Sequence, residues 1–159
     1  MDPGDLVRIT LGEAHRVFVE NVRGISLDEA LEAAGGFRSV LGIAKHTAAW
    51  NAVYHSCAFE PAPSHWDTTD SPRGLRDQID PSAEYLGEIL AWFERTDAAW
   101  LASLAEVEDF SEPRPIHWGG SVSLADIVAM VAAHWAYHAG EINSISRFSE
   151  ERPGSTPRK

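Results

Sequence analysis

Cysteine, long hydrophobic runs and basic residues are all scarce in this chain of 159 residues. The single cysteine, Cys57, excludes an intrachain disulfide framework and any C-x-x-C metal or redox motif, as suits a reducing cytoplasm. No run of about 18 apolar residues occurs, and the chain does not open with the basic and then apolar pattern of a signal peptide. We therefore expect a cytoplasmic protein that is neither exported nor membrane-spanning.

Lysine and arginine number only 13 against 24 acidic residues, which gives a net charge of −11. No stretch forms a basic stripe, so the electrostatic footprint for phosphate backbones is missing and nucleic acid is not an expected partner. E-x-x-H and H-E-x-x-H are also absent, which argues against a ferritin-like di-iron bundle and against a zincin protease.

Proline, glycine and helix-capping residues divide the chain into four expected helices, and no alternating run of β-branched residues suggests a sheet. The fold class is therefore all-α, with residues 1–150 as a single domain and 151–159 as a flexible C-terminal tail. The expected helices begin at Asp2-Pro3, Ser39, Asp80-Pro81 and Ser123, and extend to about Gly24, Phe59, Val107 and Phe148.

A long polar connection, from Glu60 to Asp80, separates the second expected helix from the third. Antiparallel neighbours in a bundle are usually joined by about two to eight residues. The length of this connection therefore predicts a crossover, with the second and third helices running parallel.

Two histidines four residues apart, in the segment HWAYHAGEIN, fall on the apolar face of the last expected helix. His134 and His138 would then bring two imidazoles to one point inside the bundle, where two neutral rings compete for hydrogen-bond donors. Each buried polar group left without a partner costs about 1–3 kcal/mol. His46 falls on the inward face of the second helix in the same way. Three inward histidines with an open fourth position are typical of a catalytic zinc site, although a hydrogen-bonded core remains an alternative.

Glu141 shares the face of His134 and His138, so it can orient a ligand histidine, ligate the metal itself or act as a base. His15 also faces inward, as a pocket or core residue, whereas His55 lies opposite His46 on its helix and is expected at the surface. His65 and His117 each precede a tryptophan in a loop, where they could line the mouth of a cleft, although exposed loop histidines are the commoner case. Cys57 lies about 16 Å along the helix from His46, too far to share its metal, and is expected to be a buried thiol.

Two of these segments resemble motifs of the DinB-like superfamily of metalloenzymes. Ser39-Val40-Leu41-Gly42-Ile43-Ala44-Lys45-His46 is similar to the family's second-helix motif, and His134 to Ile142 is similar to its H-x-x-x-H-x-G-Q-I motif. The resemblance extends over essentially the whole chain. The departure is Glu141, where the family more often has glutamine.

The resemblance implies a four-helix bundle of up-down-down-up type, often a homodimer, that binds zinc or nickel through His46, His134 and His138. It also implies a thiol-dependent transferase or isomerase that uses mycothiol, bacillithiol or glutathione with a small-molecule substrate. The alternative is a non-catalytic metal-binding stress or interaction protein of the same fold.

Overall fold

The computed structural model describes residues 3–33, 38–64 and 80–150, and within them the chain is mostly helical. The helices are α1 (Pro3–Val22), α2 (Leu27–Leu31), α3 (Val40–Phe59), α4 (Ala83–Ala105) and α5 (Leu124–Glu150). Strands β1 (Pro113–Pro115) and β2 (Ser121–Ser123) pair antiparallel between α4 and α5. The expected Asp2 cap, His65 and the tail 151–159 lie outside the described residues.

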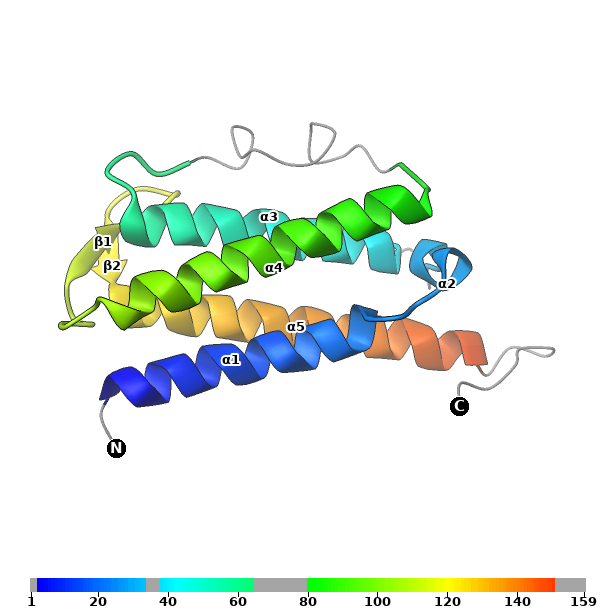
Figure 1. Ribbon diagram of the computed structural model, residues 1–159, viewed down its shortest axis with the longest axis horizontal. Coiled ribbons are helices and arrows are strands. Elements are labelled where there is room, and N and C mark those ends of the chain that lie inside the picture. The colour runs from blue at the N-terminus through cyan, green and yellow to red at the C-terminus, as the bar shows by residue number, and fades with distance from the viewer. Residues whose placement is uncertain (1–2, 34–37, 65–79, 151–159) are drawn as a thin grey trace.

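The long helices α1, α3, α4 and α5 lie along the longest axis of the molecule (Figure 1). α3 and α4 run from the end that holds α2 toward the β1–β2 hairpin, and α1 and α5 run in the opposite direction. α1 packs mainly against α5, and α3 packs against both α4 and α5. The interface between α3 and α5 is the one that brings the candidate site together.

Side-chain caps fix where three of the helices begin. Ser39 accepts a hydrogen bond from the backbone N–H of Gly42 at 3.1 Å, and Ser123 forms reciprocal bonds with Asp126, so both predicted caps are confirmed. The expected start of the third helix at Asp80-Pro81 is wrong, because Ser82 caps α4 by accepting from Tyr85.

Two short elements were not expected from the sequence. The Ser26–Glu29 capping box starts α2, a helix of only five residues. The β1–β2 hairpin turns through Gly119 and Gly120, whose φ angles of 96° and 80° favour glycine. Hydrogen bonds from Leu124 to Glu112 and from Ala125 to Phe110 join this hairpin to the start of α5.

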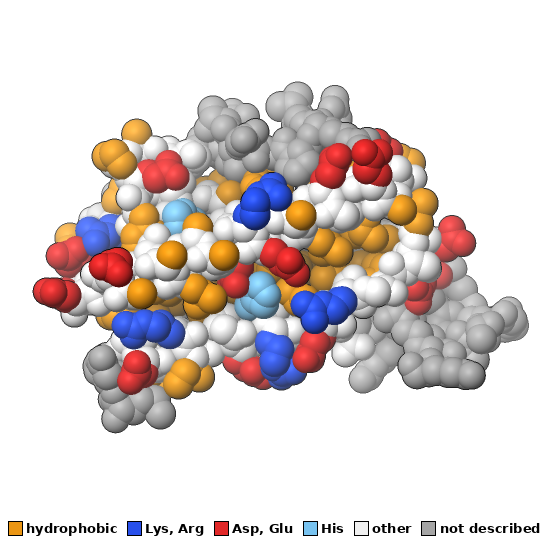
Figure 2. All heavy atoms as spheres, viewed as in Figure 1, with side chains coloured by type: hydrophobic (Ala, Val, Ile, Leu, Met, Phe, Trp, Pro, Cys, Tyr) orange, Lys and Arg blue, Asp and Glu red, His pale blue; other side chains and the backbone are white. Residues whose placement is uncertain are grey.

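Large apolar side chains from all four long helices form one continuous core. Its fully buried members include Phe18, Tyr85, Trp100 and Trp135. On the face shown in Figure 2, acidic and basic side chains are interspersed rather than gathered by sign. Within the described residues, every helix is too short or too polar to cross a membrane.

Candidate metal centre

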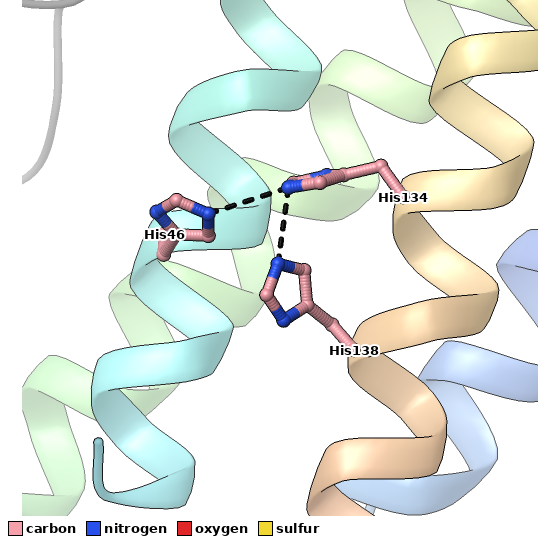
Figure 3. Close-up of side chains that lie close together, drawn as sticks. All are labelled: His46, His134 and His138. Atoms are coloured by element: carbon pink, nitrogen blue, oxygen red, sulfur yellow. Dashed lines mark hydrogen bonds between the residues drawn. The ribbon is translucent and has the colours of Figure 1, made fainter. Parts of the chain in front are cut away.

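The three histidines that the sequence singled out meet between α3 and α5. His46 comes from α3, and His134 and His138 come from successive turns of α5 (Figure 3). The spacing of four residues places the last two rings on one helix face, and the packing of α3 against α5 supplies the third. In the part of the chain that the structure describes, this is the only group of three or more histidine, cysteine or acidic residues whose ligand atoms converge.

The ring atoms that approach one another are the Nε2 atoms. His134 Nε2 lies 3.3 Å from His46 Nε2 and 3.0 Å from His138 Nε2. One ligand atom from each of the three residues lies within 4.8 Å of the other two. Because zinc–imidazole bonds are about 2.0–2.1 Å long, tetrahedral ligation requires nitrogen atoms about 3.3 Å apart. The two short separations therefore already match the spacing that a shared cation needs.

Glu141 lies on the far side of the His138 ring from this meeting point. The His138 Nδ1–H donates to Glu141 Oε2 at 2.8 Å, and only 6% of the His138 side chain is exposed. The carboxylate accepts and cannot donate, so it keeps the His138 proton on Nδ1 and leaves the Nε2 lone pair facing the cluster. Of the roles considered for Glu141, this contact matches the orientation of a ligand histidine.

Hydrogen bonds among the three rings leave at least one buried nitrogen of the cluster without a partner among the described residues. Because the proton of neutral His138 is on Nδ1, its Nε2 atom can only accept a hydrogen bond. The neighbouring Nε2 atom of His134 must then carry a proton and donate it to His138. The single Nε2 proton of His134 cannot bond His46 and His138 equally well. In this tautomer His134 Nδ1 is a buried acceptor, and it has no hydrogen-bond partner among the described residues. A cation bound to the three lone pairs removes the conflict at Nε2, so the residues present fit a divalent metal.

Burial lowers the pKa of both α5 histidines of the cluster. Desolvation, followed by the nearby His138 and Arg38, lowers the pKa of His134 to about 3. Desolvation also lowers the pKa of His138, while the hydrogen bond and charge of Glu141 act in the opposite direction. Neutral imidazole is the form that binds a metal, and it suits zinc, nickel, copper and iron.

The remaining histidines have separate environments. His117 packs against Trp50 and Tyr54, with ring centroids 4.5 and 5.6 Å away, so it lies beside the site. His15 faces inward as expected, and its Nδ1 lies 2.8 Å from Asp97 Oδ2 without the alignment of a hydrogen bond. This close contact joins α1 to α4.

The expected surface position of His55 is wrong. Its ring packs edge-on against Trp100 at 5.4 Å, and its Nε2 lies 3.3 Å from Ser103 Oγ. α4 covers this face of α3, and the resulting burial lowers the pKa of His55. Cys57 is fully buried as expected, and burial raises the pKa of its thiol.

Sequence reasoning missed a set of polar groups inside the core. Asn51 is 0% exposed, and neither side-chain amide atom has a hydrogen-bond partner among the described residues. Asp97 is also buried, and no hydrogen-bond partner of its Oδ1 lies in the described part of the chain. Asp97 could have been recognised from the sequence, because it falls beside Phe93 and Trp100 on the apolar face of α4. A carboxylate at such a core position needs a partner.

A helical protein with three convergent imidazoles on two neighbouring helices belongs to the class of α-bundles with an internal histidine cluster that could hold a metal ion. The sequence pattern of the DinB superfamily matches residues 10–142, and the chain belongs to that superfamily. A crystal structure of a conserved protein from Enterococcus faecalis is similar in fold, with a TM-score of 0.64 and 19% identity. The similarity covers 92% of this chain and 96% of that one. No curated protein matches the chain.

Proposed function

We propose that this protein is a divalent-metal-dependent enzyme in which His46, His134 and His138 hold zinc or nickel. One observation carries the proposal: ring nitrogens from three histidines on two helices converge, with the Nε2 atom of His134 lying 3.3 Å from that of His46 and 3.0 Å from that of His138. Three protein ligands leave at least one coordination position for substrate or water, as catalytic sites require and closed structural sites do not.

Two features of the chain prepare these ligands. Glu141 is a positioning residue, because it holds the His138 proton on Nδ1 and directs Nε2 to the metal position. Burial of His134 keeps its ring unprotonated near neutral pH, so a proton does not compete for its lone pair. When bound, the cation would lower the pKa of a thiol or water and so supply a nucleophile at neutral pH.

The proposed reaction is the transfer or isomerisation of a small molecule with a low-molecular-weight thiol of the mycothiol, bacillithiol or glutathione type. Membership of the DinB superfamily supports this class of reaction. We further propose a cytoplasmic homodimer built on an up-down-down-up bundle. The net charge of −11 argues against nucleic acid as a partner.

Metal content tests the site. Protein purified without a nickel column should contain, or take up after dialysis against zinc or nickel, about one equivalent of metal. His138→Ala should lower that uptake strongly, whereas His55→Ala, which removes a half-buried histidine outside the cluster, should leave it unchanged. A wild-type protein that retains less than about a tenth of an equivalent under both conditions would rule out the site.

Thiol binding tests the reaction class. Adding glutathione or a mycothiol analogue to the cobalt- or nickel-loaded protein should produce a sulfur-to-metal absorption band, and this band should be absent in His138→Ala. A loaded protein that shows no change with any of these thiols would favour the non-catalytic metal-binding alternative.

A further inference from the structure

Three rings lie beside the histidine cluster, and we call them the aromatic wall: Trp50 and Tyr54 of α3 and His117 of the β1–β2 loop. The centroids of Trp50 and Tyr54 are 5.6 Å apart, and His117 lies 4.5 Å from Trp50. The wall adjoins the cluster directly. Trp50 lies 6.3 Å from His46, and Tyr54 lies 6.5 Å from His134, both measured between ring centroids.

The aromatic wall is not part of the closed core. The rings at the centre of the bundle, such as Tyr85, Trp100 and Trp135, are 0% exposed, whereas all three members of the wall are only partly buried. Trp118, which meets His117 edge-on at 4.6 Å, is 57% exposed. A partly exposed aromatic surface beside a few convergent polar groups is the usual composition of a small-molecule site.

The hairpin explains how a loop histidine reaches this position. Ile116 is only 5% exposed and anchors the loop in the core, next to the residue that joins the wall. The backbone N–H of Gly119 donates to Ile116 O at 2.9 Å, and the pairing of β1 with β2 closes the turn. β1 itself packs against α3. The backbone around His117 is therefore fixed over α3 by contacts that do not involve the imidazole.

We propose that the aromatic wall binds the planar, aromatic or conjugated part of the substrate and places its reacting atom at the three-histidine cluster. This inference rests on the proposed function and adds the substrate class to it. A flat π-system stacks on an aromatic ring with the ring centroids about 4.5–7 Å apart. Trp50 and Tyr54 lie 6.3 and 6.5 Å from cluster histidines, so a ligand stacked on either ring would also be close to the cluster.

A pair of ligands that differ only in one ring tests this inference. Imidazole and 4-phenylimidazole coordinate a metal through the same nitrogen, but only the second carries a phenyl group that can stack. With cobalt-loaded protein, the visible absorption bands of the metal give both dissociation constants. We expect 4-phenylimidazole to bind about 10-fold more tightly than imidazole.

Matched variants locate the source of that preference. Tyr54→Leu should reduce it to about 3-fold or less while the affinity for imidazole stays the same. Tyr137→Leu makes the same change at an exposed ring that lies 5.0 Å from His138 but outside the wall, so it should keep the full preference. His117→Leu serves as a second wall variant if Tyr54→Leu does not fold by circular dichroism.

The outcomes separate the two proposals. If cobalt binds and both ligands have equal affinity, or if the preference survives in the wall variants, the inference about the wall is overturned while the metal site stands. If cobalt does not bind, the metal proposal fails, and saturation-transfer NMR of 4-phenylimidazole with metal-free protein decides the role of the wall. Transfer to the phenyl protons that disappears in Tyr54→Leu supports the wall, and its absence in the wild type overturns it.

Discussion

Acid should destabilise the metal-free protein through His134. The pKa of this residue is lowered to about 3 in the folded chain, chiefly by burial, against an ordinary value of 6.5. Between these two values the unfolded chain binds a proton that the folded chain does not. The stability that depends on neutral His134 is therefore fully present above pH 6.5 and is lost progressively as the pH falls toward 3.

The magnitude follows from proton linkage. Each pH unit inside this window lowers the free energy of unfolding by about 1.4 kcal/mol for one such group. Two pH units would lower the free energy of unfolding by roughly 3 kcal/mol. Because His134 is only partly buried, solvent screens part of this effect, and we expect a loss of about 1–2 kcal/mol between pH 6.5 and 4.5. That loss is a large fraction of the roughly 5–15 kcal/mol by which a typical domain is stable.

Urea denaturation of chelator-treated protein measures this effect. Wild type and His134→Gln, whose side chain does not titrate, are compared at about pH 7 and about pH 4.5, and the unfolding free energy comes from linear extrapolation. The difference between the two pH values should be smaller in His134→Gln by about 1–2 kcal/mol. Equal losses in both proteins would show that His134 is protonated in the folded chain and would refute the burial argument.

Three further predictions concern other contacts. Glu141→Ala should weaken zinc or nickel binding by about 10–100-fold in a competition titration, whereas Glu141→Gln, which can still accept the proton of His138, should weaken it less. Gly120→Ala should cost about 1 kcal/mol in thermal or urea unfolding, because φ is 80° there while the space for a methyl group is open. Asp97→Leu should cost about 2–3 kcal/mol by leaving His15 without its carboxylate, and the double variant with His15→Leu should recover much of that loss in a double-mutant cycle.

Helical periodicity predicted the inward faces of the three histidines, and the packing of α3 against α5 supplied the condition for them to meet. The spacing between His134 and His138 places both rings on one face whatever the rest of the chain does, and their apolar neighbours show that this face is buried. The same reasoning failed for His55, because the angle around a helix axis does not say which neighbouring helix covers that side. α4 covers the side of α3 opposite His46, so His55 packs on Trp100 instead of facing solvent.

Short elements and buried polar groups lay beyond the reach of periodicity. α2 has five residues and the hairpin strands have three each, too few for a repeat to be visible, and their signals were the Ser26–Glu29 capping box and the Gly119-Gly120 pair. The contact of His15 with Asp97 joins α1 to α4, helices that are distant in sequence. Such a pairing depends on tertiary packing, which a single sequence does not specify.

Adjacent residues on α5 link the core to the cluster. His134 faces α3, while Trp135, next along the helix, is 0% exposed and packs against Phe93 of α4 at 5.1 Å and His15 of α1 at 6.0 Å. A rotation of α5 that moved the His134 and His138 rings away from His46 would also withdraw the Trp135 indole from these contacts. Burial of an aromatic side chain of this size contributes several kcal/mol, as the cost of about 3–5 kcal/mol for its truncation to alanine indicates. The hydrophobic core therefore fixes the rotation of α5, and with it the convergence of the three imidazoles, without the help of a bound metal.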